Sequence, residues 1–274
     1  ETLNRLVAED STFKVSRDVQ THELVVTGMS NLHLEVILSR LKSRYEIDVD
    51  SRQPKIPHKE TITTKASAQY KHKKQTGGKG QYAEVYLRIE PLERGAGFEF
   101  TTKIVGRAIP SQYIPAVEKG LRETISKGIL SNNPIVDVRV ELYDGSFHNV
   151  DSSEAAFKIA ASKAFHLAFN DAKPVLLEPV VNIEVTIPSE FMGEITGNLS
   201  SRRGRVQGMD SFGDLQVVQA SIPMDEVKNY ETELKSMTGG RGSYTMELSH
   251  YDIVPSHLVP AIIAGAKKDA EKTD

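Results

Sequence analysis

Hydrophobic and polar positions divide the first 57 residues into alternating helices and strands. The pattern predicts a helix over 1–10, short strands over 12–19 and 22–29, a helix after Ser30, and a strand over 45–50. Ser30 is of the type that caps a helix. The apolar positions of that helix recur at the spacing of one buried face, namely Leu34, Ile37, Leu38, Leu41 and Tyr45. This order is a split βαβ unit without its first strand, so we expect the chain to belong to a longer one.

The middle of the chain begins after a proline-containing boundary at 52–61, because proline breaks both sheet ladders and helices. Two strands there flank a glycine-rich turn. A third strand, a helix that stops at Gly128, and an alternating strand over 136–143 follow. Asp151 and Glu154 stand three apart, as in a capping box, before an alanine-rich helix. The middle part is therefore predicted to be a ββ(β)αβα domain.

The remainder of the chain shows a second, complete split βαβ pattern. A break at 173–179 precedes a strand, a helix from Ser189, another strand, a helix that ends before Gly239, and a final strand. Residues 256–274 read as a helix with a charged tail. The chain is thus predicted to be α+β, with three domains over 1–57, 58–175 and 176–255.

Composition places the chain among ordinary globular proteins. It has 274 residues, of which 39% are apolar and 26% charged, enough for two or more packed cores. Its apolar runs fall far short of the roughly 20 residues that span a membrane, and no signal-peptide pattern opens it, so we expect a cytoplasmic protein. The absence of cysteine excludes disulfides, thiolate zinc sites and a cysteine nucleophile. The histidines include no metal-binding spacing, so no metal site is expected.

Lysines and glycines gather in the predicted hairpin over 61–83, which contains no Asp or Glu. Such a hairpin concentrates positive charge that can engage phosphates, and its glycines permit close approach of the backbone to a ligand. The same composition fits an ordinary solvated hairpin, and composition does not decide between the two. The residues concerned are Lys65, Lys71, Lys73, Lys74 and Lys79 with Gly77, Gly78 and Gly80.

Catalytic patterns are not found. A phosphate-binding loop would need glycine at position 73 and serine or threonine at position 80, where the chain has Lys73 and Gly80. No G-x-S-x-G nucleophile elbow occurs. Asp137 and Glu141 alternate on the polar side of a strand, where solvated carboxylates are expected. We therefore predict that this chain is not an enzyme by itself.

A second candidate segment is the turn over 144–153. Tyr143, Phe147 and His148 can offer aromatic faces, and His148 with Asn149 can donate hydrogen bonds to a sugar or a base edge. A lone histidine in a loop is, however, more often solvated or structural.

Arginines stand beside glycines at two turns of the last domain, over 198–209 and 238–246. Guanidinium groups bind phosphates strongly, so these turns can contact RNA. Helix C-capping, with glycine in the left-handed conformation and arginine near the negative end of the helix, explains the same pattern. The arginines are Arg202, Arg203, Arg205 and Arg241.

Several of these segments resemble translation elongation factor G. GMSNLHLEVILSRLKSRYEIDV is similar to its third domain, KQTGGKGQY and YDGSFHNVDSSEAAFKIA to its fourth, and EFMGEITGNLSSRRGRVQGM with TGGRGSY to its fifth. The resemblance covers essentially the whole chain in the expected order. It implies a truncated ferredoxin-like domain over 1–57, a domain similar to domain 2 of ribosomal protein S5 over 58–175, and a ferredoxin-like domain over 176–255. The helix over 256–274 is expected to pack back on the S5-like domain.

The resemblance also implies partners and site residues. The expected partners are the ribosome, its ribosomal RNA, and the duplex of messenger and transfer RNA in the decoding centre. Loops 73–81 and 144–151 would enter the decoding centre while that duplex moves. The protein is expected to act as a monomer. Gln75 and His148 match the family's glutamine and histidine. The arginine turns would contact large-subunit RNA. The implied tip residues are Lys73, Lys74, Gln75, Gly77, Gly78, Lys79, Gly80, Gln81, His148 and Asn149.

Departures from the family leave other roles open. Ser30-Asn31 stand where the family usually has Gly-Glu, and Asn149 stands where it has an acidic residue. A paralogue specialised for ribosome recycling or ribosome protection is therefore an alternative. No cofactor is expected in this chain, since GTP and magnesium belong to the absent GTPase domain of the parent protein. A small-molecule enzyme on an S5-like fold is the rival of another class, but GGKG lies between two strands and does not open a helix.

Overall fold

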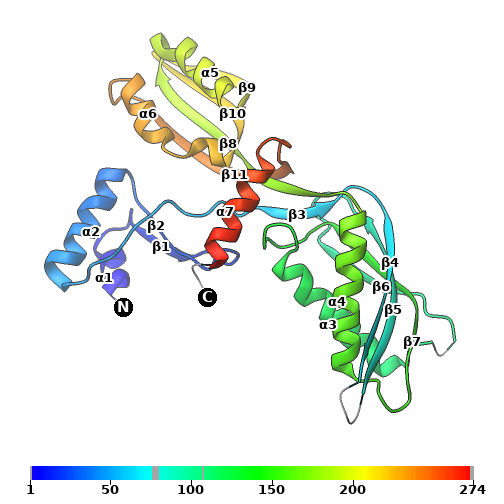
Figure 1. Ribbon diagram of the computed structural model, residues 1–274. Coiled ribbons are helices and arrows are strands. Elements are labelled where there is room, and N and C mark those ends of the chain that lie inside the picture. The colour runs from blue at the N-terminus through cyan, green and yellow to red at the C-terminus, as the bar shows by residue number, and fades with distance from the viewer. Residues whose placement is uncertain (1, 76–79, 107, 272–274) are drawn as a thin grey trace. The chain divides into compact units, whose positions relative to one another are not determined.

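The computed structural model describes residues 2–75, 80–106 and 108–271. The chain has the predicted α+β architecture and divides into two compact units (Figure 1). One unit contains residues 1–57 and 179–250, and the other contains residues 58–178 and 251–274. None of the described helices is long and apolar enough to cross a membrane.

The first residues of the first unit form two helices and a two-stranded antiparallel sheet. Ser30 caps the second helix as expected, because its side chain accepts a hydrogen bond from the amide of His33. The strand expected over 45–50 is wrong. Glu46 takes a left-handed conformation with φ 55°, which turns the backbone away after the helix, and residues 46–58 form no strand. The elements are α1 (Thr2–Glu9), β1 (Lys14–Arg17), β2 (Leu24–Thr27) and α2 (Asn31–Tyr45).

The other part of this unit has a sheet of order β11-β8-β10-β9. Its core lies between that sheet and two helices, and Ile183, Val185 and Val218 are fully buried there. The break expected at 173–179 does not interrupt β8, which runs unbroken for 15 residues, and β9 was not located from the sequence. The elements are β8 (Pro174–Pro188), α5 (Met192–Ser201), β9 (Arg205–Phe212), β10 (Leu215–Pro223), α6 (Tyr230–Met237) and β11 (Ser243–Ile253). Residues 174–178 of β8 and 251–253 of β11 belong to the second unit.

The second unit is built on a four-stranded sheet of order β4-β5-β7-β6. Helices α3 and α4 pack along one face of this sheet (Figure 1), where alternating residues such as Val85, Leu87 and Ile89 are fully buried. We call the opposite face, which carries no described helix, the open face. The elements are β3 (Lys59–Ile62), β4 (Ala66–Lys74), β5 (Gln81–Pro91), β6 (Phe98–Thr102), α3 (Ile114–Lys127), β7 (Val138–Ser146), α4 (Glu154–Asp171) and α7 (Val259–Glu271).

The packing of α3 on α4 depends on Gly120, since a Cβ at that position would lie 2.6 Å from the carbonyl oxygen of Lys158. His166 on α4 lies beside this crossing. Burial lowers the pKa of His166 from the usual 6.5, Lys163 lowers it further, and only Glu60 opposes them. The surroundings therefore favour the neutral imidazole over the charged one.

The lowered pKa of His166 predicts that the stability of the protein depends on pH. Because the pKa is lower in the folded state than in the unfolded state, the unfolded chain binds more protons as the pH falls below about 6.5. The contribution of His166 to the free energy of unfolding should therefore be constant above pH 7 and should decrease as the pH falls from 6.5 toward 5.5. His166→Gln should flatten that decrease. Urea denaturation of both proteins between pH 5.5 and 7.5 measures the difference, and identical pH profiles would contradict it.

Candidate nucleic-acid interface

The two segments singled out from the sequence lie together at one end of the β4-β5-β7-β6 sheet. The amide of Gly80 donates to Asp151 Oδ1 at 3.1 Å, and the amide of Tyr82 donates to the carbonyl of Asp151 at 2.9 Å. The hydroxyl of Ser152 donates to the carbonyl of Tyr82 at 2.7 Å. Three hydrogen bonds thus tie the base of the β4–β5 hairpin to the segment after β7. We call these joined segments the tip.

Three groups of the tip lie around one ring nitrogen of His148. The amides of Asp151 and Val150 lie 3.2 and 3.4 Å from Nδ1, and Oδ2 of the Asp151 carboxylate lies 3.3 Å from the same atom. Its own amide donates to Ser152 Oγ at 2.9 Å, and its ring lies 6.2 Å from that of Tyr82. The side chain is 54% exposed. The described polar contacts of the ring are to Nδ1, so Nε2 has no partner among the described residues and can form a hydrogen bond with a ligand.

The capping box expected from Asp151 and Glu154 is wrong. The residue before α4 is Ser153, whose side chain accepts a hydrogen bond from the amide of Ala156. Asp151 lies too early to cap the helix and accepts from Gly80 instead. The carboxylate therefore joins the two segments of the tip, a role that the sequence did not indicate.

Positive charge is distributed unevenly along the hairpin. Lys65 pairs with Glu90 at 2.7 Å and Lys71 with Glu84 at 3.8 Å, so the absence of acids from 61–83 does not leave these lysines unpaired. Lys73 and Lys74 are exposed and have no partner within the described parts of the chain. The free cations of the hairpin that the structure describes thus lie next to the tip.

The remaining tip residues differ in their surroundings. Gln75 and Asn149 are exposed, whereas Gln81 Oε1 lies 2.9 Å from Nε2 of His72. Gly80 packs closely, because a Cβ there would lie 3.0 Å from Cγ of Asp151. The predicted site residues Gly77, Gly78 and Lys79 lie outside the described residues.

Most arginines of the last domain have structural partners. Arg202 contacts the Glu233 carboxylate and donates to the carbonyl of Glu226 at 2.6 Å. Arg203 donates to Glu226 Oε1 at 2.9 Å and itself adopts the left-handed conformation, with φ 61°, so the expectation that glycine does so at this turn is wrong. Gly204 is needed for space, since a Cβ there would lie 2.5 Å from a backbone carbonyl.

Arg241 and Arg205 are the other two arginines of the last domain that the sequence predicts to contact RNA. Arg241 pairs with Glu190 at 2.6 Å and lies over the ring of Phe191. Arg205 is exposed at the start of β9, with no partner among the residues that the structure describes. Gly239 and Gly240 take the left-handed conformation after α6, as capping predicts. Of the four arginines, Arg205 is the one whose contacts leave it most available to a ligand.

Neither a metal cluster nor a solvated Asp137 is found among the described residues. The described residues contain no group of three or more acids and histidines that could hold a metal ion. Asp137 is not a solvated strand residue as expected. It is 3% exposed, has φ 59°, and accepts hydrogen bonds from the amides of Gly95 and Gly97 at 3.0 Å each. It fixes the turn after β5.

The sequence did not indicate three residues that hold the tip together. Tyr82, Asp151 and Ser152 hold the two segments together through contacts about 70 positions apart, and no local spacing announces such contacts. Val150 is 63% exposed on the same loop. Tyr143 was placed with this group but packs on the open face against Tyr86 instead.

Comparison with known proteins identifies the class. Family models match elongation factor G domain III over residues 1–53, domain IV over 54–173 and the elongation factor G C-terminus over 175–262. These three matches follow one another along nearly the whole chain. The chain belongs to the elongation factor G family, and the resemblance seen in the sequence is confirmed.

A solved structure agrees with this assignment. The crystal structure of a protein from Thermus thermophilus matches with 43% sequence identity and a TM-score of 0.84. The match covers 97% of this chain and 40% of that protein. The chain therefore spans less than half the length of this relative.

Proposed function

We propose that this chain is the ribosome-binding arm of an elongation factor G-like protein that promotes movement of transfer and messenger RNA. The tip would enter the decoding centre and contact the RNA duplex there, while the last domain, through Arg205, contacts ribosomal RNA. GTP and magnesium would bind elsewhere in the full-length protein, which acts as a monomer in the cytoplasm. The three domains of the family define the separate parts of the arm.

The joined tip is the observation that supports this proposal best. Asp151, Tyr82 and Ser152 hold two distant segments as one projecting surface. That surface presents Nε2 of His148 and the exposed ammonium groups of Lys73 and Lys74, for which the described residues supply no partner. Hydrogen-bond donors suit the edges and sugars of RNA, and ammonium groups suit its phosphates.

The proposal predicts a loss of function at the tip. In the full-length protein, Gln75→Ala combined with His148→Ala should slow translocation by about tenfold or more, because two contacts to the moving duplex are lost. Stopped-flow fluorescence of labelled messenger RNA measures the rate. Arg122→Ala on α3, whose described contacts are with Glu118 and Phe98 and not with the tip, serves as a control that should retain the rate. An unchanged rate in the double variant would show that the tip has another role.

The paralogue alternative rests on Asn149, which stands where the family usually has an acidic residue. One carboxylate is then missing from the tip, and Asn149 is exposed where that charge would be. A protein devoted to ribosome recycling should split ribosomes but translocate slowly. Light-scattering measurement of subunit splitting, beside the translocation assay, separates the two functions, and Asn149→Asp should raise translocation if this residue sets the difference.

A further inference from the structure

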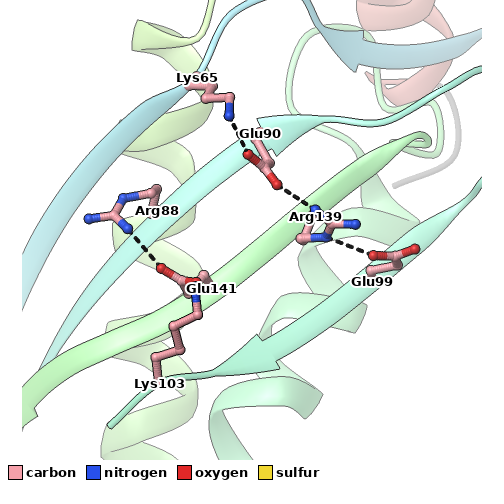
Figure 2. A network of polar contacts seen from close by, with 7 residues as sticks. All are labelled: Lys65, Arg88, Glu90, Glu99, Lys103, Arg139 and Glu141. Atoms are coloured by element: carbon pink, nitrogen blue, oxygen red, sulfur yellow. Dashed lines mark hydrogen bonds and ion pairs between the residues drawn. The ribbon is translucent and has the colours of Figure 1, made fainter. Parts of the chain in front are cut away.

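The open face of the second unit carries charged side chains in rows across its strands (Figure 2). In one row Glu90 accepts from Lys65 at 2.7 Å and from Arg139 at 2.6 Å, and Arg139 also donates to Glu99. In the next row Glu141 accepts from Arg88 at 2.9 Å and from Lys103 at 2.6 Å. The first row is neutral, but the second has two cations to one carboxylate and keeps a net positive charge.

In the second row the carboxylate is much less exposed than the two cationic side chains. The Glu141 side chain is 12% exposed, whereas those of Arg88 and Lys103 are 53% and 71% exposed. The carboxylate thus lies beneath the two cationic groups and orients them, while their charged ends reach solvent. A phosphate approaching this row would meet guanidinium and ammonium groups before it meets a carboxylate.

Aromatic rings lie directly beside the positive row. The Arg88 guanidinium lies 4.9 Å from the centre of the Tyr143 ring, and Tyr143 meets Tyr86 edge to face at 6.0 Å. A β-bulge between Tyr86 and Leu87 adds Tyr143 to this group, because it shifts the register between β5 and β7. Tyrosine rings and guanidinium planes are the groups on which unpaired bases stack.

The same surface is continuous with the tip. Along β5 the open face continues from Arg88 through Tyr86 and Glu84 to Tyr82, which is paired in register with Lys73. The six residue steps from Tyr82 to Arg88 span about 20 Å at the usual rise of a strand. Lys71 lies over the ring of Tyr82 at 5.3 Å, so a cation and a tyrosine meet again near the tip.

We propose that the open face is a second RNA-binding surface, on which a single-stranded RNA segment stacks bases on Tyr86 and Tyr143 and sets a phosphate between Arg88 and Lys103. This surface extends the tip and rests on the proposed RNA-binding function. A duplex is a poorer ligand, because its bases are already stacked and cannot reach the tyrosines.

The test uses the 274-residue chain and a fluorescein-labelled oligouridylate of 12 nucleotides, with binding followed by fluorescence anisotropy. Tyr86→Leu with Tyr143→Leu should weaken binding about tenfold or more, the loss expected for base stacking. The matched pair Tyr86→Phe with Tyr143→Phe keeps both rings and should bind within twofold of the unsubstituted chain. Circular dichroism verifies that each variant is folded.

The charge is tested separately. Arg88→Gln leaves Glu141 paired with Lys103, so the fold should be retained, and it should lower the salt dependence of binding by about 0.7 in the logarithmic slope. Arg122→Gln on α3 removes an equally exposed, ion-paired arginine and should change nothing. If the leucine pair does not fold, Arg88→Gln against Arg122→Gln decides the question.

Several results would overturn the proposal: no binding of the oligouridylate, equal affinity of the leucine and phenylalanine pairs, equal losses in Arg88→Gln and Arg122→Gln, or tighter binding of a 12-base-pair RNA duplex. Lys73→Ala with Lys74→Ala, measured in the same assay, reports on the tip alone. Losses confined to this tip variant would reject the open face and leave the proposed function standing. Losses confined to the open-face variants, together with normal translocation by the Gln75 and His148 variant, would reject the tip role alone.

Discussion

Glu60→Ala is expected to lower the free energy of unfolding of the second unit by about 4 kcal/mol, among the largest effects of any single substitution in the chain. The Glu60 side chain is fully buried on β3. Its Oε2 accepts from the amides of Ile129 and Leu130 at 2.8 and 2.9 Å, and its Oε1 accepts from the amides of Ser131 and Asn133 at 2.8 and 3.2 Å. Alanine would leave four amide groups without this acceptor.

The cost is large because the loop is shaped around the carboxylate. Gly128, which ends α3, has φ 74°, and a Cβ there would lie 2.8 Å from Glu60 Oε1 and 2.1 Å from the carbonyl oxygen of Asn133. The amides of the loop therefore point at one buried site. Each unsatisfied buried donor costs about 1–3 kcal/mol, although water entering the space left by the side chain recovers part of that loss.

Urea denaturation followed by amide exchange of β4, β5 and α4 peptides measures this unit separately from the other. Glu60→Gln should lose about half as much, because one oxygen remains as an acceptor while the new amide group faces donors. Glu118→Ala is the matched control. The partner of Glu118 among the described residues is Arg122 on the surface of α3, and such pairs contribute less than about 1 kcal/mol. A loss of less than 1 kcal/mol in Glu60→Ala would contradict the prediction.

Glu60 also shows where the sequence was informative and where it was not. Alternation and helical spacing predicted the buried face of β5 and the helix that ends at Gly128, because these patterns depend on residues close together in the chain. The four amides that bind Glu60 lie about 70 positions away. The sequence around Glu60, a single glutamate in a short segment that follows two prolines, does not indicate that its carboxylate binds these distant amides.

The predictions that the structure contradicts failed largely for the same reason, namely that the outcome depends on contacts between residues far apart in the chain. The strand expected over 45–50 has the right alternation, but strands also need a partner edge, and the pattern does not say whether one is present. Asp151 stands at capping-box spacing, yet Ser153 lies closer to the first helical residue and takes the cap. The lysines of the hairpin read as free because Glu84 and Glu90 fall just outside the run and meet them only across the strands.

In the candidate RNA-binding site, too, local motifs were predictable from the sequence and contacts between distant segments were not. The family motifs indicated Gln75 and His148, and both lie on described segments at the tip. The residues that hold those segments together came from the fold. Asp151→Ala is therefore expected to loosen the tip without unfolding the unit, since the described contacts of its carboxylate are with Gly80 of the hairpin and with His148, and not with the core.

Loss of this bond should speed exchange of the Gly80 amide by about tenfold or more, because a hydrogen bond to a charged group contributes about 1.5–3 kcal/mol. The neighbouring bond from the Tyr82 amide to the carbonyl of residue 151 needs no side chain and should weaken less. Amide exchange followed by NMR measures both. Asp144→Ala is the matched control, since the described bond of that exposed carboxylate is to the next residue's own amide.

The same substitution connects the tip's rigidity to its proposed role. In the full-length protein, Asp151→Ala should slow translocation by about tenfold, because the hairpin and the His148 loop would no longer present their donors in one fixed arrangement. Asp151→Asn retains an oxygen that can accept from Gly80, so it should recover most of the rate even though the charge is lost. If the asparagine variant is as slow as the alanine variant, the negative charge itself acts at the tip. If both are as fast as the unsubstituted protein, holding the two segments together is not what makes the tip work.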